Sequence, residues 1–590
     1  MTNREDDAAE AARAWLKQDP DPETKAELQR LLEQQRAGDT HANEKVTHLF
    51  SGRLAFGTAG IRGPLQAGPM GMNRVVIAQT TAGLAGYLLA QGGRNAERKI
   101  RVAVAGDART NSATFAADTA AVLSGYGIEA ILLPEELPTP VLAFAVRSLG
   151  ADAGVMVTAS HNPPKDNGYK VYLGGMDEGS QIIPPVDSDI EARIIEVAQT
   201  LVWGEIPQDP EAVTRADSNI VDQYVAATLS SLIPRPPETD PLAVVYTALH
   251  GVGAGTFFDA VKAAGFPAVI PVPEQTRPDS AFPTVAFPNP EEKGALDLSK
   301  ELARKYSAAL IIAHDPDADR LALALPLDGD YVSLTGNQVG AILGWHCSSQ
   351  AHREGRHGAL ANSLVSSPVL GKIANHFGLD HHETLTGFKY VSRVPNLIFG
   401  FEEALGYLVT PDVVRDKDGI SAGLMALDLT YSLAAEGRTL WDYLETIEAT
   451  VGGFASSQIT IMLTDQGHKP SLSEQLRTTP PQTIGSLGIS QRDDFLDGVG
   501  DYPPENILRY YLDDGSRVII RPSGTEPKLK IYLDTQGATR ADAEAALISL
   551  EREVHSLVES LPQAVYAVTS VSSRASLSSN FAKAPPAALS

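Results

Sequence analysis

One serine stands in a loop whose composition suits phosphoryl chemistry. Residues 158–163 read Thr-Ala-Ser-His-Asn-Pro and follow the apolar run 155–157, which is typical of a β-strand. Ser160 is therefore predicted at the carboxyl end of a strand, where open α/β sheets bind their ligands. A serine hydrolase would need a Gly-x-Ser-x-Gly turn and an activating base. Because Ala159 and His161 flank the serine and adjacent side chains on an extended loop point apart, we expect a serine that carries a phosphoryl group.

Three carboxylates, those of Asp315, Asp317 and Asp319, alternate directly after another apolar run. On an extended loop alternate side chains point to one side, so the three are expected to converge on a cation that prefers oxygen ligands. An EF-hand would need glycine and glutamate where Arg320 and Pro326 stand. A solvated turn is the alternative, but carboxylates this close repel one another without a cation. Three side-chain ligands leave room for a substrate or phosphoserine oxygen, which suits magnesium.

A third loop, residues 521–528, has the composition of an anion cradle between two strand-like runs. Arg521 offers a planar fork of donors, and Ser523 and Thr525 offer hydroxyl groups. Gly524 lets backbone amides approach a phosphate oxygen closely. This loop is predicted to bind phosphate.

Paired carboxylates, Glu402 and Glu403, follow the apolar run 397–399. Acidic residues at loop ends are often only solvated, but a position at the end of a buried strand favours function. We expect these carboxylates to accept hydrogen bonds from sugar hydroxyls.

Together these loops resemble the α-D-phosphohexomutase superfamily, in the order in which the family has them and over about residues 54–534. The resemblance covers an N-terminal signature at residues 56–63, a phosphoserine loop at 158–163, a metal loop at 315–320, a sugar loop at 402–406 and a phosphate loop at 521–528. Residues 247–253, 386–389 and 401–404 resemble the branch that contains phosphoglucomutase 2 and phosphopentomutase. Ala404 stands where many members have serine, so one hydroxyl contact to the sugar is missing.

The resemblance implies a magnesium-dependent mutase that interconverts sugar 1-phosphates and terminal sugar phosphates through a phosphoserine and a sugar bisphosphate. Glucose 1-phosphate and glucose 6-phosphate are the expected pair, with phosphopentomutase and phosphomannomutase activities as alternatives. The implied cofactors are Mg²⁺ and a primer, sugar 1,6-bisphosphate or pentose bisphosphate. The implied residues are Ser160, His161, Lys389 and Arg62 for catalysis, Ser160, Asp315, Asp317 and Asp319 for the metal, and Arg320, Glu402, Glu403, Arg521, Ser523, Gly524 and Thr525 for the substrate. The resemblance does not tell which residue acts as the general acid and which as the general base, and His161 and Lys389 remain candidates for both.

Composition limits the partners. The 590 residues include 48 basic and 73 acidic side chains, a formal charge of −25 that argues against nucleic acid or an anionic membrane as partner. The partner that the resemblance implies is a phosphorylated monosaccharide. The single cysteine, Cys347, excludes an internal disulfide framework and suits a cytoplasmic protein. No apolar run approaches the roughly 18 residues of a membrane span, and the acidic N-terminus lacks a signal-peptide core. We expect a monomer or weak dimer.

Alternation of strand-like runs with alanine-rich helical segments predicts an α/β fold. Residues 101–105 and 130–133 are expected as strands and 112–125 as a helix. By resemblance, three similar α/β domains precede a smaller C-terminal α+β domain around a central cleft. The expected divisions are a helical extension at 1–50, domains at 51–205, 206–333, 334–455 and 456–560, and a disordered tail at 561–590.

Two other classes of function compete with this interpretation. The glycines of residues 251–255 follow a strand-like run and resemble a dinucleotide-binding turn of an oxidoreductase. Thr256 stands at the last glycine position, and a helix-capping turn explains the cluster equally well. The other alternative is a non-catalytic sugar-phosphate binding protein, but a binder needs neither Ser160 nor three aspartates.

Overall fold

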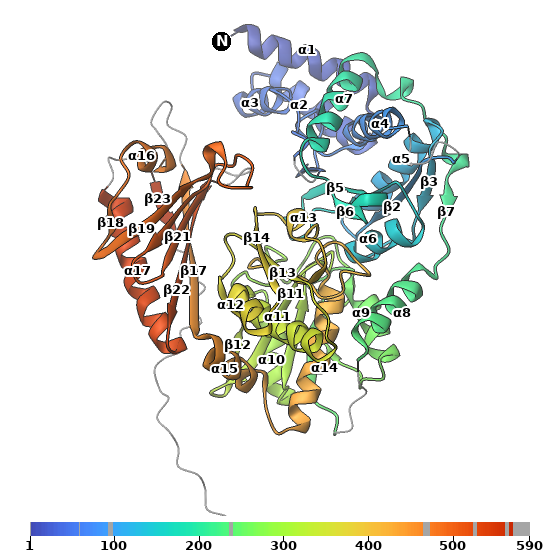
Figure 1. Cartoon of the computed structure of the whole chain (residues 1–590). Coiled ribbons are helices and arrows are strands. Elements are labelled where there is room, and N and C mark those ends of the chain that lie inside the picture. Colours follow the sequence, from blue (N-terminus) through green and yellow to red (C-terminus); the bar gives the residue numbers. More distant parts are fainter. Residues whose placement is uncertain are drawn as a thin grey trace, which may run out of the picture. The chain divides into compact units, whose positions relative to one another are not determined.

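The computed structural model describes residues 2–57, 60–92, 98–234, 240–463, 472–522, 528–560 and 566–569. The chain divides into two compact units, Met1–Val451 and Gly452–Ser590 (Figure 1). Among the described residues no helix is both long and apolar enough to cross a bilayer.

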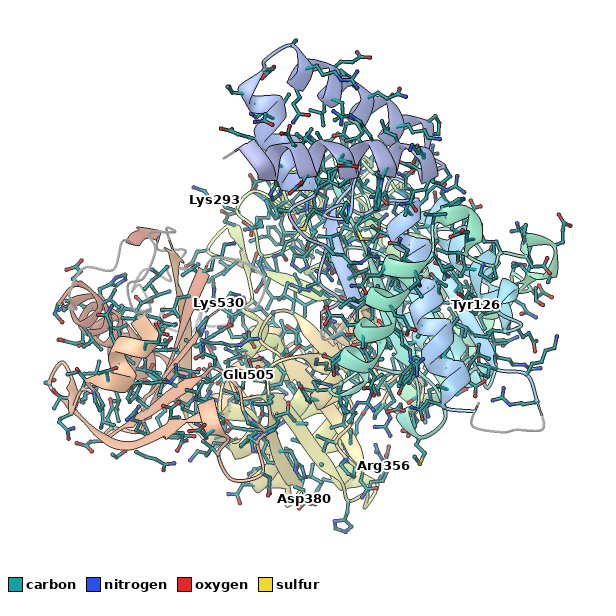
Figure 2. All side chains as sticks on the ribbon, turned by 90° about the horizontal axis from the view of Figure 1, so that it is seen from above. Tyr126, Lys293, Arg356, Asp380, Glu505 and Lys530 are labelled. Atoms are coloured by element: carbon teal, nitrogen blue, oxygen red, sulfur yellow. The ribbon has the colours of Figure 1, made fainter. Side chains whose placement is uncertain are left out.

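The first fifty residues form helices, as predicted. They are α1 (Thr2–Gln18), α2 (Pro22–Arg36) and α3 (Thr40–Leu49). Asp21 caps α2 by accepting a hydrogen bond from the backbone N–H of Glu23 at 2.8 Å, and Leu28 and Leu32 are buried. Polar side chains project outward from these helices (Figure 2).

The first α/β domain has a mixed sheet in the order β1-β5-β4-β2-β3-β7, with β6 paired to β5. Its strands are β1 (Gly60–Pro64), β2 (Arg101–Gly106), β3 (Glu129–Leu132), β4 (Ala153–Val157), β5 (Asp166–Leu173), β6 (Ser180–Gln181) and β7 (Thr214–Arg215), and its helices are α4 (Arg74–Ala90), α5 (Ser112–Gly125), α6 (Thr139–Ser148) and α7 (Val186–Thr200), with short helices η1 (Gly175–Asp177), η2 (Trp203–Glu205) and η3 (Pro210–Ala212). Strands β2, β3 and β4 are parallel and buried, as strands covered on both faces must be. The strands and helix predicted between residues 101 and 133 are confirmed to within one residue. Ser160 follows the buried strand β4.

The second sheet has the order β12-β11-β10-β8-β9 and positions the three aspartates after β10. Its elements are α8 (Ile220–Leu232), β8 (Val244–Thr247), α9 (Gly253–Ala263), β9 (Ile270–Pro271), α10 (Asp297–Tyr306), β10 (Leu310–His314), β11 (Leu321–Leu327) and β12 (Asp330–Ser333). Strand β10 is buried along its whole length and pairs in parallel with β8. The aspartates are therefore held at the end of a rigid central strand.

The third sheet has the order β14-β13-β15-β16, and Glu402 is the last residue of β15. Its elements are α11 (Gly336–Arg353), β13 (Ala359–Ser363), α12 (Val369–Phe377), β14 (Asp380–Thr384), α13 (Phe388–Val391), β15 (Leu397–Glu402), β16 (Gly406–Leu408), α14 (Gly419–Ala435) and α15 (Leu440–Val451). Helix α14 follows this sheet in sequence but contacts α9 and β10 of the second domain. This return crossing ties the second and third domains together.

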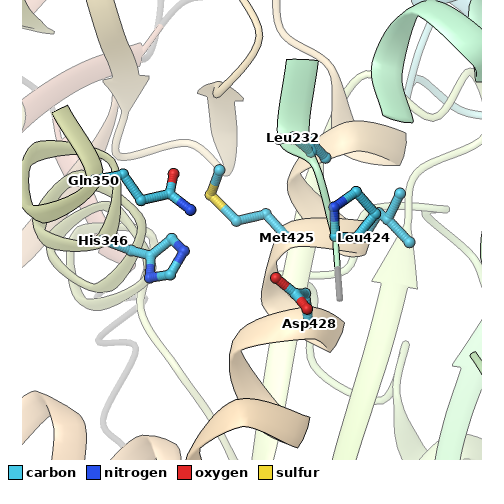
Figure 3. A pocket seen from close by; sticks show the side chains of 7 residues that line it. Leu232, His346, Gln350, Leu424, Met425 and Asp428 are labelled. Atoms are coloured by element: carbon cyan, nitrogen blue, oxygen red, sulfur yellow. The ribbon is translucent and has the colours of Figure 1, made fainter. Parts of the chain in front are cut away.

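A small hollow between α8, α11 and α14 is lined by Leu232, Pro234, His346, Gln350, Leu424, Met425 and Asp428 (Figure 3). It is too narrow to hold a water molecule. Burial lowers the pKa of His346 to about 4, so this imidazole is neutral near pH 7. The neighbouring Cys347 is buried, and burial raises the pKa of its thiol to about 12, which fits a structural cysteine.

The second unit is antiparallel, in the order β18-β19-β20-β21-β22-β17-β23, and agrees with the predicted α+β domain. Its elements are β17 (Gly453–Leu463), α16 (Leu472–Thr478), β18 (Thr483–Ile484), β19 (Leu487–Asp494), η4 (Phe495–Asp497), β20 (Leu508–Leu512), β21 (Arg517–Pro522), β22 (Lys528–Gly537), α17 (Arg540–Ser560) and β23 (Tyr566–Thr569). Strand β23 pairs with β17 inside the segment predicted to be a disordered tail, so that prediction is wrong for these four residues. Strand β23 pairs with the edge of β17, and the sequence around residues 566–569 does not reveal this distant partner.

Candidate active site

The serine loop turns sharply at the serine itself. Ser160 has a φ of 51°, and its Oγ lies 3.2 Å from Nδ1 of His161. The prediction that these two side chains point apart was therefore wrong, because it assumed an extended loop. The hydroxyl of Ser160 also donates a hydrogen bond to Oδ2 of Asp315 at 2.9 Å. The serine loop and the metal loop thus meet at this oxygen.

The three aspartates converge, as predicted, but for a different reason. Asp315, Asp317 and Asp319 each offer an oxygen within 4.8 Å of the others. The loop is a turn closed by the N–H of Ala318 donating to the carbonyl of Asp315, with a φ of 54° at Ala318, rather than an extended segment. Oδ1 of Asp317 and Oδ1 of Asp319 are buried and accept no hydrogen bond from the described residues. Buried carboxylate oxygens without donors fit the hard cation that the sequence predicts.

Two lysines balance the charge of these carboxylates. Nζ of Lys170 lies 2.7 Å from Oδ2 of Asp317 and 3.0 Å from Oδ2 of Asp319, and Nζ of Lys417 lies 3.1 Å from Oδ2 of Asp319. Burial would raise the pKa of Asp317 and Asp319, but the ammonium groups outweigh burial and lower both. Burial, followed by repulsion from these two aspartates, raises the pKa of Asp315 well above its usual range. A cation would relieve that repulsion.

His161 is enclosed beside two cations. Burial, reinforced by the guanidinium groups of Arg320 and Arg62, lowers the pKa of His161 well below its usual range. The imidazole is therefore neutral near pH 7. A neutral ring nitrogen at 3.2 Å from the hydroxyl of Ser160 can accept a proton.

Two of the predicted cationic residues contact the serine and metal loops. Arg62, on β1, donates from Nη1 to the side-chain oxygen of Asn162 at 3.1 Å. The backbone N–H of Arg320 donates to Oδ1 of Asp315 at 3.0 Å, and its Nε lies 4.0 Å from Oδ2 of the same residue. Lys389 is buried in α13, with its Nζ 5.1 Å from the ring centroid of Tyr390.

The sugar loop is bonded to the metal loop through the backbone. The N–H of Leu321 donates to the carbonyl of Leu405 at 3.1 Å. Glu402 accepts a hydrogen bond from the N–H of Gly387 at 2.7 Å, and Glu403 accepts one from the hydroxyl of Ser366 at 2.9 Å. Glu403 also accepts a hydrogen bond from the hydroxyl of Ser363 at 3.3 Å on the same oxygen. Each glutamate is thereby oriented through one carboxylate oxygen, and the second oxygen remains for another donor.

The predicted phosphate loop lies in the second unit. Arg521 is half-buried at the end of β21, and its Nε is buried without a hydrogen bond to any residue that the structure describes. An unpaired guanidinium donor suits an anion. Ser523, Gly524 and Thr525 lie outside the described residues, as do Thr58 and Ala59 of the N-terminal signature.

Four charged residues of the site escaped the sequence reasoning. Lys170 lies within β5 and Lys417 before α14, where neither spacing nor composition marks them. Asp107 and Arg109 follow β2, and this position at the carboxyl end of a parallel strand was an available signal.

The glycines of residues 251–255 serve the metal loop, and the predicted helix-capping turn is confirmed. The N–H of Val252 donates to the carbonyl of Pro316 at 2.8 Å, and α9 begins at Gly253. A Cβ on Gly251 would lie 2.2 Å from Cα of Pro316, whereas one on Gly255 would meet nothing within 4 Å. The glycine at position 251 is needed for close backbone contact.

This contrast gives a matched pair of variants. We expect Gly251→Ala to displace the metal loop, to destabilise the fold by about 1–3 kcal/mol as overpacking does, and to weaken Mn²⁺ binding at least about threefold. Gly255→Ala should leave binding unchanged and stabilise helix α9 by up to about 1 kcal/mol. Thermal unfolding and Mn²⁺ titration followed by electron paramagnetic resonance measure both effects. Equal behaviour of the two variants would contradict the proposed contact.

Comparison with known proteins decides the family. Models described as phosphoglucomutase/phosphomannomutase α/β/α domains I, II and III match residues 53–200, 222–327 and 335–450, and the model of the C-terminal domain matches 483–550. A probable phosphomannomutase of Haemophilus influenzae is 46% identical over 490 residues, covering 83% of this chain and 98% of the relative.

The chain belongs to the phosphoglucomutase/phosphomannomutase family. It is therefore an enzyme of the phosphosugar mutase class, an intramolecular phosphotransferase. The mouse phosphopentomutase is 34% identical over 562 residues, covering 88% of this chain and 89% of the relative, which supports the predicted branch. The crystal structure of a phosphoglucomutase/phosphomannomutase family protein from Burkholderia thailandensis has a TM-score of 0.66 at 20% identity, covering 87% of this chain and 99% of that one. This likeness supports the fold.

Within this mutase the predicted loops of the first unit come together. The serine, metal and sugar loops are joined by the hydrogen bonds of Ser160 to Asp315 and of Leu321 to Leu405. The arrangement can bring a hydroxyl nucleophile, a cation and acceptors for a sugar to one place.

Proposed function

We propose that this mutase is magnesium-dependent and moves a phosphoryl group between the 1-position and the terminal hydroxyl of a sugar through phosphorylated Ser160 and a sugar bisphosphate. Glucose 1-phosphate and glucose 6-phosphate are the substrate pair that we place first. The observation that carries the proposal is the hydroxyl of Ser160, 2.9 Å from Asp315 and beside two buried carboxylate oxygens without donors. A protein that only bound sugar phosphates would need neither feature.

Asp315, Asp317 and Asp319 would hold the magnesium ion together with an oxygen of phosphorylated Ser160. When bound, the ion supplies positive charge that stabilises the transferring phosphoryl group. Lys170 and Lys417 both contact Oδ2 of Asp319, so Oδ1 of this residue remains available to the ion.

In the first transfer a sugar hydroxyl attacks the phosphorus on Ser160, the bond from phosphorus to Oγ breaks, and a bond from phosphorus to the sugar oxygen forms. The sugar hydroxyl attacks on the side of phosphorus opposite to Oγ, so its proton leaves to a base on that side. Neutral His161, 3.2 Å from Oγ, is placed to accept the proton of Ser160 in the return transfer, when Oγ is the attacking oxygen. Lys170, held charged between Asp317 and Asp319, can donate a proton but cannot accept one. Arg62 and Arg320 would stabilise charge on the transferring group.

The bisphosphate then turns end for end, and its other phosphate returns to Ser160. Arg521, Ser523, Gly524 and Thr525 would hold the phosphate that does not react. Because both orientations use one site, the sugar must be held by hydroxyl acceptors such as Glu402 and Glu403. Sugar 1,6-bisphosphate, or the pentose bisphosphate, is the proposed primer.

Two other substrates have specific support. The probable phosphomannomutase of H. influenzae is 46% identical to this chain, which favours mannose 1-phosphate. Ala404 lacks the hydroxyl that many members place against the sugar, and a phosphopentomutase is among the relatives, which together favour a pentose 1-phosphate.

The deciding experiment compares kcat/KM for glucose 1-phosphate, mannose 1-phosphate and ribose 1-phosphate, with magnesium and a trace of the matching bisphosphate. A dominant glucose rate would support the first choice, and a dominant mannose or ribose rate would replace it. Absence of turnover with all three would favour the non-catalytic binding protein.

Glu402 makes the rate depend on pH. Burial, followed by repulsion from Glu403, raises the pKa of Glu402 to about 7. We expect kcat/KM to fall as the pH falls through about 7, because a protonated carboxyl group accepts fewer hydrogen bonds from the sugar. Glu402→Gln should lose this inflection while keeping any that belongs to the substrate phosphate.

The raised pKa of Glu402 also affects stability. The folded protein binds the proton of Glu402 more tightly than the unfolded chain does, so protonation of Glu402 stabilises the fold at low pH. This stabilisation is lost as the pH rises through about 7.

The predicted domain boundaries, the cytoplasmic location and the monomeric or weakly dimeric state remain proposals. The buried single thiol of Cys347 supports a reducing compartment.

A further inference from the structure

The backbone of Ser160 is held on both sides by residues to which the proposed mechanism assigns no role. Its N–H donates to Oγ1 of Thr158 at 2.9 Å, and the hydroxyl of Thr158 donates to Oδ2 of Asp107 at 2.6 Å. Its carbonyl accepts a hydrogen bond from Nη2 of Arg109 at 2.6 Å. Asp107 and Arg109 therefore determine the position of the serine backbone from the loop after β2.

Arg109 acts as a clamp on the whole serine loop. Its guanidinium donates to four carbonyl oxygens, those of Ser160 at 2.6 Å, Asn162 at 2.7 Å, Pro163 at 2.9 Å and Asp166 at 3.1 Å. Its Nε lies 3.4 Å from Oδ2 of Asp107, and only 4% of the residue is exposed. A planar fork of donors is pre-organised for such a set, and a flexible ammonium is not.

The hydrogen bonds of the clamp stabilise an unfavourable backbone conformation of Ser160. With a φ of 51°, Ser160 adopts a left-handed conformation that is unfavourable for a residue with a Cβ. Such a conformation persists only where surrounding contacts enforce it. Without them the loop can relax toward an extended conformation, in which Oγ would leave Asp315 and His161.

The second domain encloses the clamp. The ring of Phe282 lies 5.0 Å from Cζ of Arg109, and the residue is 2% exposed. Its loop is fastened by Thr284, whose hydroxyl lies 2.8 Å from Nε2 of His250 and 2.9 Å from Nε2 of Gln275. Exclusion of water strengthens the hydrogen bonds of the guanidinium beneath the ring.

We propose that Asp107, Thr158 and Arg109 are positioning residues that hold Ser160 in its left-handed conformation for phosphoryl transfer, with Phe282 as the cover of the clamp. The inference rests on the proposed function, because it assigns these residues to the transfer at Ser160. They act through the serine backbone and not on the sugar, so they should affect kcat more than KM.

The test uses Arg109→Met, Thr158→Val and Thr158→Ser in the full chain. Arg74→Met is the matched control, because it removes a comparable paired contact elsewhere in the same domain. Nε and Nη2 of Arg74 each donate to a carboxylate oxygen of Asp118 at 2.7 Å. We would measure kcat and KM with the preferred sugar 1-phosphate, hydrogen exchange of residues 158–166, and thermal unfolding.

We expect Arg109→Met and Thr158→Val to lower kcat about 10²-fold with KM changed less than about twofold, because small displacements of a reacting group have effects of this size. Exchange in residues 158–166 should accelerate in both variants. Thr158→Ser, which keeps the hydroxyl, should recover kcat to within about threefold of the wild type. Arg74→Met should keep both the rate and the local exchange.

A Thr158→Val protein with kcat within about twofold of the wild type would overturn the inference. This result would be decisive even if the Arg109→Met protein did not fold. Losses of kcat that are equal in Arg109→Met and Arg74→Met, without faster local exchange, would overturn it as well. A wild type without turnover would instead refute the proposed function, and the exchange rates would still test the clamp.

Discussion

Replacing Ser160 with alanine is expected to lower kcat by at least about 10⁴-fold, the size of loss seen when a covalent nucleophile is removed. The proposed reaction begins with a phosphoryl group on Oγ, and alanine has no atom that can carry it. Neither His161 nor Asp315, which contact Oγ at 3.2 and 2.9 Å, can replace the missing hydroxyl in a productive position. The measurement is turnover of the preferred sugar 1-phosphate, together with peptide mass spectrometry of the serine loop after incubation with the bisphosphate.

The fold should survive this change. The contacts of Oγ with Asp315 and His161 are lost, so the free energy of unfolding should change by about 1–2 kcal/mol. Ser188→Ala, at an exposed position of α7, controls for the effects of expression and purification on a serine-to-alanine variant. It should retain full activity. Near-normal turnover of Ser160→Ala, or a phosphoryl group found on another residue, would refute the assignment of Ser160.

Asp317→Asn should have the second largest effect. Its Oδ2 accepts hydrogen bonds from Lys170 at 2.7 Å and from the hydroxyl of Thr139 at 2.6 Å, while its Oδ1 is buried without a donor. An asparagine removes one negative charge from the cation site. With its oxygen kept toward Lys170 and Thr139, its amide nitrogen replaces the oxygen that would bind the cation. We expect Mn²⁺ affinity to fall at least about tenfold and kcat by about 10²–10³-fold, because the transferring charge loses its stabilisation.

Stability should fall as well, by about 3–5 kcal/mol, since Lys170 is left as an incompletely paired buried charge. Asp118→Asn is the matched control, because it breaks the ion pair with Arg74 without touching the metal loop. Mn²⁺ binding followed by electron paramagnetic resonance separates loss of the cation from loss of activity. An Asp317→Asn protein that binds Mn²⁺ as tightly as the Asp118→Asn protein would remove Asp317 from the proposed cation site.

Much of the fold follows from local patterns. The helix at Ser112–Gly125 and the strand at Arg101–Gly106 lie where alanine-rich and β-branched segments place them. Asp21 caps α2 as its residue type predicts. Strand β23 was missed because its four residues are stabilised by pairing with β17, more than a hundred residues earlier.

The residue types alone predicted a nucleophile, a cation site and hydroxyl acceptors. Ser160, the three aspartates and Glu402 each come after a short apolar run that predicts a buried strand, and a chain leaves such a strand at the end of its sheet. The short stretch of chain around each motif therefore contains enough information to place it at a ligand-binding edge.

The tertiary structure decided how these groups meet and which partners tune them. Ser160 meets His161 with a left-handed backbone, and Arg109 donates to the carbonyl of Ser160 from a different loop. Lys170 and Lys417 lie about 150 and 100 residues from the aspartates that they pair with. Charge balance in a buried site is set by proximity in space, because Coulomb interactions in a low-dielectric interior depend on distance and not on separation along the chain.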